Sequence, residues 1–533
     1  MKWFRKWMHK KPGYPIIPED HHSEAEETAN LNLDLEQNEL IFKRIFHKSA
    51  DIAFRKVQSA GKDHWLIIYF TTLVEEELIN KHILEPMIAK STKQDELFII
   101  NTESLDDQVI SLGMTSMTSE VKEIVNQVLN GHAAVLTLGN CEAMLVKVNA
   151  KSQRSLDEPS SEPVIRGPRV GFIEKISTNI GLIRAKIKTS RLKMESFTIG
   201  ELTKTPVVIT YIEGIASESI IEEVRKRVGR IQIDGIIDSG YVEEFIEDSP
   251  YSPFPLVHST ERPDVVAAEL LEGKVAILVD TSPFVLIVPM TFWTGLQASE
   301  DYYIRWPIAT FVRWIRFLFI SIAIFAPPLY VAISTFNQEM IPTNLVLSIA
   351  SSREPVPFPA VIEAFIMEIV FEALREAGIR LPKQIGQAIS IVGALVIGQA
   401  AVLAGIISAP VVIIVSITGI AAFTIPRYSF ANGIRLLRFP MLLLAGTLGL
   451  YGIVIGLLGI VLHISSLRSF GVPYFTPAAP VNFSELKDVI IRAPIWAKTR
   501  RPNETSMKDT VREPTGQKPS PGSAAAKGKE APE

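Results

Sequence analysis

The chain has 533 residues and a formal net charge of −4, which is too small to indicate a nucleic-acid partner. Its single cysteine, Cys141, excludes an internal disulfide, and no Cys/His spacing predicts a metal site. Hydrophobic residues make up 47% of the chain, and charged residues are almost absent from 317–334, 385–425 and 440–465. This division predicts a water-soluble first part and a multipass membrane part after about residue 300.

The first segment, residues 1–35, is expected to be a basic and polar tail. Its start, "MKWFRKWMHKKPGYP", lacks the apolar core of a secretory signal peptide. Aromatic residues between basic ones suit contact with an anionic membrane surface, and a solvated tail is the alternative. His21 and His22 are adjacent and not four residues apart, so we expect no metal there.

The soluble part contains a repeat with a constant offset. "WLIIYFTTLVEEELINKHI" at 65–83 and "VVITYIEGIASESIIEEVR" at 207–225 both predict a strand, a turn and a helix. The same offset relates "LNGHAAVLTLGNCEAMLVKV" at 129–148 to "LEGKVAILVDTSPFVLIVPM" at 271–290. Two separate segments that share one offset predict a tandem duplication of an α/β unit.

The duplication sets the expected domain boundaries. A first α/β subdomain covers 36–150 and a second covers 160–295, with a polar linker between them. In each copy a helix leads through a C-capping glycine, Gly131 or Gly273, into a two-stranded hairpin. Neither copy has a Gly-rich phosphate loop, an HExxH or a GxSxG sequence. We therefore expect a binding or assembly module without a cofactor, and not an enzyme.

Five apolar segments follow, in an expected all-α membrane domain at 300–470. We label them A at 307–333, B at 357–377, C at 385–408, D at 410–426 and E at 437–466. Segments A, C and E are longer than the roughly 20 residues that cross a bilayer core. Pro410 predicts a tight hairpin between C and D.

Basic residues mark one side of this domain. Arg305, Arg313 and Arg316 stand at the start of A, and further basic residues stand between B and C and between D and E. The loop at 335–356 has few basic residues. The positive-inside rule therefore places the N-terminal soluble region in the cytoplasm and that loop outside.

The C-terminal segment, 471–533, complicates the count of crossings. Five crossings would export it, yet it carries Lys498 and Arg500. We expect instead that B does not fully span, or that E is broken around Gly456 and Gly459. The segment is expected to be cytoplasmic, with a disordered Pro-, Gly-, Ser- and Ala-rich end.

Segment B carries glutamates among apolar residues. Glu368, Glu372 and Glu376 form one stripe at 100° per residue, and Glu363 lies on another face. A charged side chain at mid-bilayer costs about 3 kcal/mol, so three of them cannot face lipid. Two interpretations remain open: a carboxylate-lined route for cations, or an amphipathic surface helix whose stripe is solvated and partly paired with arginines of the same helix.

Segment C predicts close helix packing, because "IGQAISIVGALVIGQAAVLAG" spaces small residues along one helix. Its Gln387 and Gln399 fall within about 120° of each other on a helix. They either hydrogen-bond to neighbouring helices or line a polar path, which makes Gln399 a further candidate for the ion path.

Five long motifs occur in one order along the chain. They are "GPRVGFIEKISTNIGLIRAKIKTSRL" (167–192), "IGELTKTPVVITYIEGIA" (199–216), "SEDYYIRW" (299–306), "IPTNLVLSIASSREPVPFPAVIEAFIMEIVFEALREAGIRLPKQIGQAISIVGALVIGQAAV" (341–402) and "LRSFGVPYFTPAAP" (467–480). Over about residues 40–480, the chain resembles the A subunits of GerA-type spore germinant receptors. The motif positions to which we assign a structural role are Gly167, Pro168, Arg169, Pro357 and Pro359.

This resemblance implies an endospore-forming bacterium and a multipass protein of the spore inner membrane. It implies a complex with a transporter-like B subunit and a lipoprotein C subunit. The A subunits of the family look like the oligomeric part that opens when nutrients bind and releases monovalent cations. Two alternatives stay open: a secondary transporter of its own substrate, which inverted repeats or paired broken helices would favour, and a non-conducting scaffold of receptor clusters.

Overall fold

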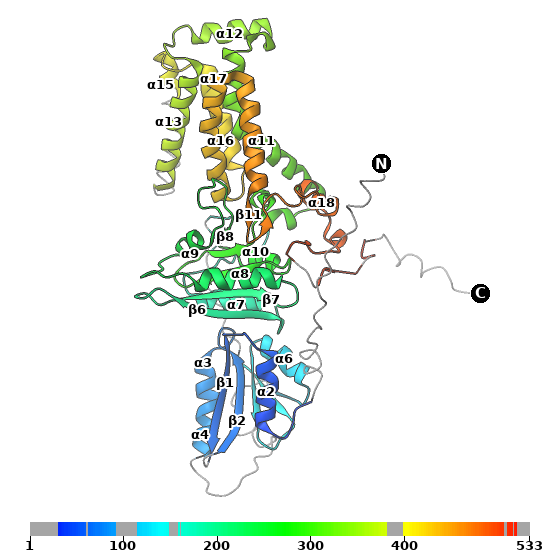
Figure 1. Cartoon of the computed structure of the whole chain (residues 1–533). Helices are drawn as coiled ribbons and strands as arrows, with labels where there is room; N and C mark the ends of the chain where they lie inside the picture. Colours follow the sequence, from blue (N-terminus) through cyan, green and yellow to red (C-terminus); the bar gives the residue numbers. More distant parts are fainter. Residues whose placement is uncertain are drawn as a thin grey trace, which may run out of the picture. The chain divides into compact units, whose positions relative to one another are not determined.

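The computed structural model describes the chain in ranges: 30–59, 62–91, 115–148, 158–159, 161–380, 398–505, 509–514 and 516–519. His21, His22, Gln387 and most of segment C lie outside these ranges. The chain separates into two compact units, Met1–Gln153 with Ile187–Lys193, and Arg154–Lys186 with Met194–Glu533. Figure 1 shows the elements of both, and each unit is described by itself.

The first unit contains a five-stranded antiparallel sheet in the order β1-β2-β4-β5-β3. Its strands are β1 (Ile52–Ser59), β2 (Lys62–Phe70), β3 (Thr115–Thr118), β4 (His132–Thr137) and β5 (Ala143–Lys147). Its helices are α2 (Leu35–Ile45), α3 (Glu76–Ile79), the π-helical turn η2 (Asn80–Leu84), α4 (Glu85–Ser91) and α6 (Val121–Leu129).

Side-chain alternation along β2 explains why helices cover both faces of this sheet. Leu66 and Ile68 pack with the helices α2 and α6, whereas Trp65 and Ile67 pack with α3, η2 and α4. Successive residues of a strand point to opposite faces, so an unbroken apolar strand requires an apolar partner on each side. The result is a three-layer α/β/α sandwich.

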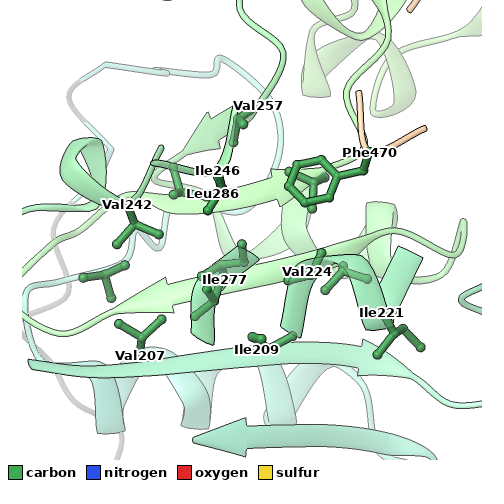
Figure 2. Close-up of a cluster of buried hydrophobic side chains, with 14 of the residues drawn as sticks. Val207, Ile209, Ile221, Val224, Val242, Ile246, Val257, Ile277, Leu286 and Phe470 are labelled. Carbon is green, nitrogen blue, oxygen red and sulfur yellow. The ribbon is translucent and has the colours of Figure 1, made fainter. Parts of the chain in front are cut away.

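The second unit begins with a sheet of the same design, in the order β6-β7-β9-β10-β8. Its strands are β6 (Leu192–Ile199), β7 (Thr205–Ile212), β8 (His258–Thr260), β9 (Val275–Val279) and β10 (Val285–Val288). Its helices are α7 (Ile176–Lys186), α8 (Glu218–Gly229), α9 (Ser239–Ile246) and α10 (Pro263–Leu270). Figure 2 shows the core beneath α8 and α9, where side chains of both helices meet those of β7, β9 and β10.

The predicted duplication is confirmed at the level of strand register. Ile67 pairs with Val135 in the first sheet, and Ile209 pairs with Ile277 in the second, at the offset seen in the sequence. The capping glycines Gly131 and Gly273 have φ angles of 84° and 87°, a conformation that favours glycine. The outer strands β1, β3, β6 and β8 were not predicted, because polar residues interrupt their apolar alternation.

The second unit continues into a helical region (Figure 1). Its helices are α11 (Trp306–Thr335), α12 (Thr343–Arg353), α13 (Ala360–Arg380), α15 (Gly398–Leu403), α16 (Ala409–Phe423) and α17 (Tyr428–Ser466). Of these, α11, α13, α16 and α17 pack side by side. By length and composition, α11 and α17 are able to cross a membrane. The predicted loop at 335–356 contains the helix α12, and segment B begins and ends three residues later than predicted.

Helix α17 reverses direction at Gly449, where the backbone is not helical (φ 59°, ψ −140°). A Cβ atom on Gly452 would lie 2.1 Å from the carbonyl oxygen of Leu444, and one on Gly456 would lie 2.3 Å from the sulfur of Met441. Residues so far apart along one helix meet only if residues 428–448 and 450–466 form two antiparallel legs. Segment E is therefore broken, but at Gly449 and not at the predicted Gly456 or Gly459.

The second leg returns the chain to the second sheet. Phe470 inserts into the sheet core (Figure 2), and Arg227 lies 4.2 Å over the ring of Phe470. The hairpin β11 (Arg468–Ser469) and β12 (Val472–Pro473), the helix α18 (Phe483–Ile490) and the 3₁₀ turn η7 (Ile495–Ala497) follow. The segment after residue 470 is thus ordered over much of its length, and residues 520–533 lie outside the described part.

Candidate functional site among the helices

The carboxylates of α13 face arginines of α17. Glu368 and Arg438 are each 1% exposed and form an ion pair. Glu372 accepts a hydrogen bond of 2.8 Å from Arg375 and lies 3.5 Å from Arg435. We call Glu368, Glu372, Arg435 and Arg438 the charged centre. It lies between helices whose other side chains are mostly apolar.

A proline pair in α11 explains part of this arrangement. Pro327 has no N–H, so the carbonyl oxygen of Ala323, four residues earlier, has no helical donor. Arg438 Nε donates to that oxygen at 2.9 Å. One arginine of α17 therefore binds a carbonyl of α11 and a carboxylate of α13, and joins three helices. The contacts of Arg438 were not predicted, although a Pro-Pro pair in an apolar helix signals a carbonyl that needs a donor.

Three polar atoms of the charged centre have no hydrogen-bond partner among the described residues. They are Glu368 Oε1, Glu372 Oε1 and Arg438 Nη2, and all three are buried. Buried polar atoms are paired in the great majority of cases, so these three distinguish the charged centre from an ordinary helix contact.

Glu363 belongs to a different cluster, as its position on the helix predicted. Its carboxylate is fully buried and accepts hydrogen bonds from the backbone N–H and the hydroxyl of Ser408, at 2.9 and 2.7 Å. Arg353 of α12 donates to it at 3.2 Å. Glu363 therefore holds the end of α12 and the start of α16 against the start of α13.

The remaining ion-path candidates are exposed in the single chain. Glu376 is 51% exposed and pairs with Arg380 on the same helix. Gln399 is exposed on α15. The pairs of Glu372 and Glu376 with arginines of their own helix are those expected for a surface helix, whereas the burial of Glu368 is not. The part of these residues in an ion path stays a prediction.

The motif residues lie at the junction between the second sheet and α11. Gly167 packs against the ring of Tyr303, where a Cβ would come within 2.6 Å of the ring. The carbonyl oxygen of Pro168 accepts a hydrogen bond of 2.7 Å from the buried Arg262. Two motifs far apart in the sequence, at 167–192 and 299–306, thus meet in space.

The other motif positions make fewer contacts of their side chains with distant segments. Arg169 and Pro357 are exposed, and the carbonyl oxygen of Pro359 accepts the N–H of Glu363 at the start of α13. Pro359 therefore helps to begin the helix that carries the glutamates.

The arginines at the start of α11 are buried and paired. Arg313 and Arg316 lie 3.1 and 3.0 Å from Asp301, which is 2% exposed. Arg313 also donates to the carbonyl oxygen of Asp488, in α18. These two arginines therefore connect the start of α11 to the segment after α17, and of the three that marked the cytoplasmic side only Arg305 is exposed.

Residues 40–504 match the model of the Bacillus/Clostridium GerA spore germination protein. This match covers most of the chain, including both sheets and all the helices of the charged centre. The chain belongs to the GerA family of spore germination proteins. The resemblance inferred from the five motifs is thereby confirmed.

Relatives of known sequence agree with this assignment. Spore germination protein KA of Bacillus subtilis is 42% identical over 95% of this chain and 92% of its own length. Spore germination protein A1 of the same organism is 41% identical over 86% and 94%. The uncharacterized membrane protein YfkQ of B. subtilis is 48% identical over 86% and 88%.

One solved structure is similar to part of this GerA-family chain. It is the N-terminal domain of the A subunit of the Bacillus megaterium spore germinant receptor GerK3, with 32% identity and a TM-score of 0.40. The match covers 50% of this chain and 98% of the other.

Proposed function

We propose that this GerA-family protein is the A subunit of a nutrient germinant receptor and forms the oligomeric, ligand-gated channel for monovalent cations. The observation that carries the proposal is the charged centre, with its buried unpartnered atoms Glu368 Oε1, Glu372 Oε1 and Arg438 Nη2. A fully buried ion pair between apolar helices costs desolvation energy and is weak evidence for a purely structural role. A site of this kind suits passage or gating of ions.

The exposure of several candidates supports an assembly of several chains. Within one chain, Glu363 and Glu368 are closed off by Ser408, Arg353 and Arg438. The candidates that remain accessible are Glu372, Glu376 and Gln399. We infer that these three face a path between subunits, and that the pair Glu368–Arg438 sets the position of α13 along that path. A transporter-like B subunit and a lipoprotein C subunit are the proposed partners, in the spore inner membrane.

The orientation is also a proposal. The start of α11 and the segment after α17 both adjoin the second sheet, which supports an even number of crossings and the soluble region and C-terminal segment on one side. The basic flanks favour the cytoplasm for that side. In a Cys141→Ser background, we expect a cysteine at Ser351 of α12 to react with membrane-impermeant thiol reagents in intact cells. A cysteine at the exposed Glu222 of α8 should react only after lysis, and the opposite pattern contradicts the orientation.

The channel proposal is tested by potassium release from spores, normalised to the amount of protein in the inner membrane. Glu372→Gln and Glu376→Gln remove charge and keep shape, so nutrient-triggered release should slow or change its selectivity. Glu354→Gln, on the exposed end of α12, is the matched control and should behave as wild type.

A second pair of variants tests the buried ion pair. Glu368→Gln leaves Arg438 buried without a counter-charge, so we expect less protein in the membrane. The double variant Glu368→Gln with Arg438→Gln should restore the amount of protein but not normal release. Wild-type kinetics and selectivity in this double variant and in Glu372→Gln would favour a non-conducting scaffold instead.

A further inference from the structure

Helix α18, in the segment that follows α17, has a largely apolar outer face. Phe483, Lys487 and Ile490 are exposed, and at 100° per residue they fall within about 60° of one another. Ile491, directly after the helix, is exposed beside them. A helix that faces water normally has a polar outer face. The face of α18 therefore indicates a partner other than water.

The carboxylates of α18 lie on its inner side. Glu485 accepts a hydrogen bond of 3.2 Å from the backbone N–H of Asn503. Asp488 accepts one of 3.1 Å from the hydroxyl of Tyr302 and forms an ion pair with Lys498. The helix thus turns its acidic side chains towards its own unit and its apolar ones away. This order is the reverse of that in a helix on a water-facing surface.

The end of α18 is fixed on the start of α11. The indole N–H of Trp314 donates to the carbonyl oxygen of Ile490 at 3.0 Å, and the backbone N–H of Arg492 donates to the hydroxyl of Thr310 at 3.2 Å. Thr310 and Trp314 follow the first residue of α11, Trp306, by about 6 and 12 Å along the helix axis. The apolar face of α18 therefore lies beside the first three turns of α11.

The start of α11 has the surface of a helix that enters a membrane. By length and composition, α11 is able to cross one. Arg305, directly before the helix, is exposed, and the exposed side chains of the first turns are all apolar: Trp306, Pro307, Ile308, Phe311, Val312, Trp314 and Leu318. Tryptophan and arginine side by side are typical of the level where lipid headgroups meet the acyl chains. The apolar surfaces of α11 and α18 adjoin where Trp314 contacts Ile490.

We propose that α18 lies in the interface of the lipid bilayer, with the side chains of Phe483, Ile490 and Ile491 among the lipids. Interfacial helices bury their apolar face about 5–10 Å deep, which agrees with the level of the contacts on α11. Lys487 extends its ammonium group to the headgroups from this position and is attracted by anionic lipids. Lipid suits this face better than a second chain does, because the face continues the surface of α11 where α11 enters the bilayer.

An interfacial α18 connects the membrane surface with the second sheet. Past the helix, the hydroxyl of Thr505 donates to the carbonyl oxygen of Glu272 at 2.6 Å, and the carbonyl oxygen of Thr505 accepts the N–H of Ser217 at 3.0 Å. Arg501 donates to the carbonyl oxygen of Leu271 at 3.0 Å. Residues 483–505 therefore reach from the bilayer to the segments before α8 and β9. This inference rests on the proposed entry of α11 into the membrane and not on ion conduction.

The first test is fluorescence quenching of the purified full-length protein in vesicles of phosphatidylcholine and phosphatidylglycerol. In a Cys141→Ser background, Phe483→Cys or Leu318→Cys carries a small dye, and the lipids carry a nitroxide near the headgroup or near the end of the acyl chain. The nitroxide near the headgroup should quench the dye at position 483 about twofold more than the deep one, and the reverse is expected at position 318. A dye on Glu222→Cys, in α8, should not be quenched.

The dye at position 318 distinguishes the ways in which the proposal fails. Quenching at 318 without quenching at 483 overturns the proposal and leaves α11 in the membrane. Absence of quenching at both positions overturns the proposal together with the crossing of α11. Efficient cross-linking of Phe483→Cys between two chains, with no quenching at 483, overturns it in favour of a second copy on this face.

A variant tests the same face without a dye. Phe483→Asp should make amide hydrogen exchange of residues 485–505 in vesicles about tenfold faster, because the helix leaves the lipids. In water, an acidic residue in the first turn stabilises a helix, so a solvated α18 would not lose protection. Leu202→Asp, in the turn between β6 and β7, is the matched control, since Leu202 is 81% exposed and Phe483 is 80% exposed. It should leave this exchange unchanged, and unchanged exchange in Phe483→Asp overturns the proposal.

The charge of Lys487 gives a test that depends on the lipid. Lys487→Glu should make the same exchange about fivefold faster in vesicles that contain phosphatidylglycerol, and should change it less in phosphatidylcholine alone. An equal change in both kinds of vesicle overturns the assignment of Lys487 to anionic headgroups.

Discussion

The two α/β subdomains share one fold and differ in what they bury. Strand order and register are equivalent, and in both copies an asparagine bonds the backbone of a residue six positions earlier, Asn38 to Asn32 and Asn179 to Ile173. The second copy buries the ionisable residues His258, Arg262 and Lys274, and Lys274 pairs with the half-buried Glu269. At the common offset, the first copy has Ser116, Glu120, Gln127 and His132, which are exposed or half-buried.

This difference distinguishes the residues that form the sandwich from those that attach the second sheet to the rest of its unit. The apolar alternation and the asparagine contacts occur in both copies, so they suffice for the sandwich. The buried charges occur where the second copy contacts other segments of its own unit: Arg262 binds Pro168 and Asp264, and Asp264 accepts from Tyr303 before α11. We infer that these charges were added to attach the second sheet to the helices.

The largest expected effect tests that inference directly. Arg262→Met removes hydrogen bonds to Pro168, Glu162 and Asp264 and leaves a buried carboxylate without its partner, which should cost about 3–5 kcal/mol. Glu120→Met, the equivalent change in the first copy, should cost less than about 1 kcal/mol. Hydrogen exchange in the full-length protein measures both. For Arg262→Met, β9 and β10 report the loss and β4 and β5 are the internal reference; for Glu120→Met the two pairs of strands exchange roles. Equal losses would contradict the inference.

An intermediate effect should be the same in both copies. Asn38→Ala and Asn179→Ala each remove two hydrogen bonds, to the backbone N–H and C=O of Asn32 or of Ile173, so each should cost about 1–3 kcal/mol. The measurement is the exchange protection of strands β2 and β7. Asn130→Ala, at an exposed helix end, is the control and should have little effect. A large loss of exchange protection in one copy alone would show that the asparagine contact does not stabilise the two copies equally.

The smallest effect concerns pH. Because the pKa of Glu243 is raised to about 7 from an ordinary 4.5, the folded state binds more protons than the unfolded state between these values. Stability from this group is therefore present below pH 4.5 and is lost as the pH rises through 7. Glu243→Gln should be more stable than wild type at pH 8 by about 1 kcal/mol, after allowing for solvent screening, and not at pH 4. Thermal unfolding at both pH values measures the difference, and Glu244→Gln should show none.

Much of the fold was predictable because the signal is local and repeated. Alternating apolar residues, such as those of β2, require burial on two faces whatever the neighbours are. Two copies at one offset then confirm each other. The outer strands were missed because a strand with one neighbour needs fewer apolar residues; β6, "LKMESFTI", mixes both kinds.

The candidate site was predictable only in part. The spacing of Glu363 and Glu368 predicted separate faces, and the structure places them in separate clusters. Their partners Arg353 and Arg438 were not predicted, since the pairs join residues from different helices. An ion pair between helices depends on the packing of both, which no local pattern encodes.

Residue type and spacing predicted the duplicated α/β unit, the apolar helices and the need to pair the carboxylates of α13, because burial of apolar surface and the cost of a bare charge depend on these two properties alone. The tertiary structure decided where α17 reverses. Several glycines of α17 permit a break, but within this helix only Gly449 takes a positive φ, beside Phe336 at the end of α11. It also decided that Arg313 and Arg316 are buried around Asp301. Such choices depend on contacts between distant segments, and these exist only once the chain is folded.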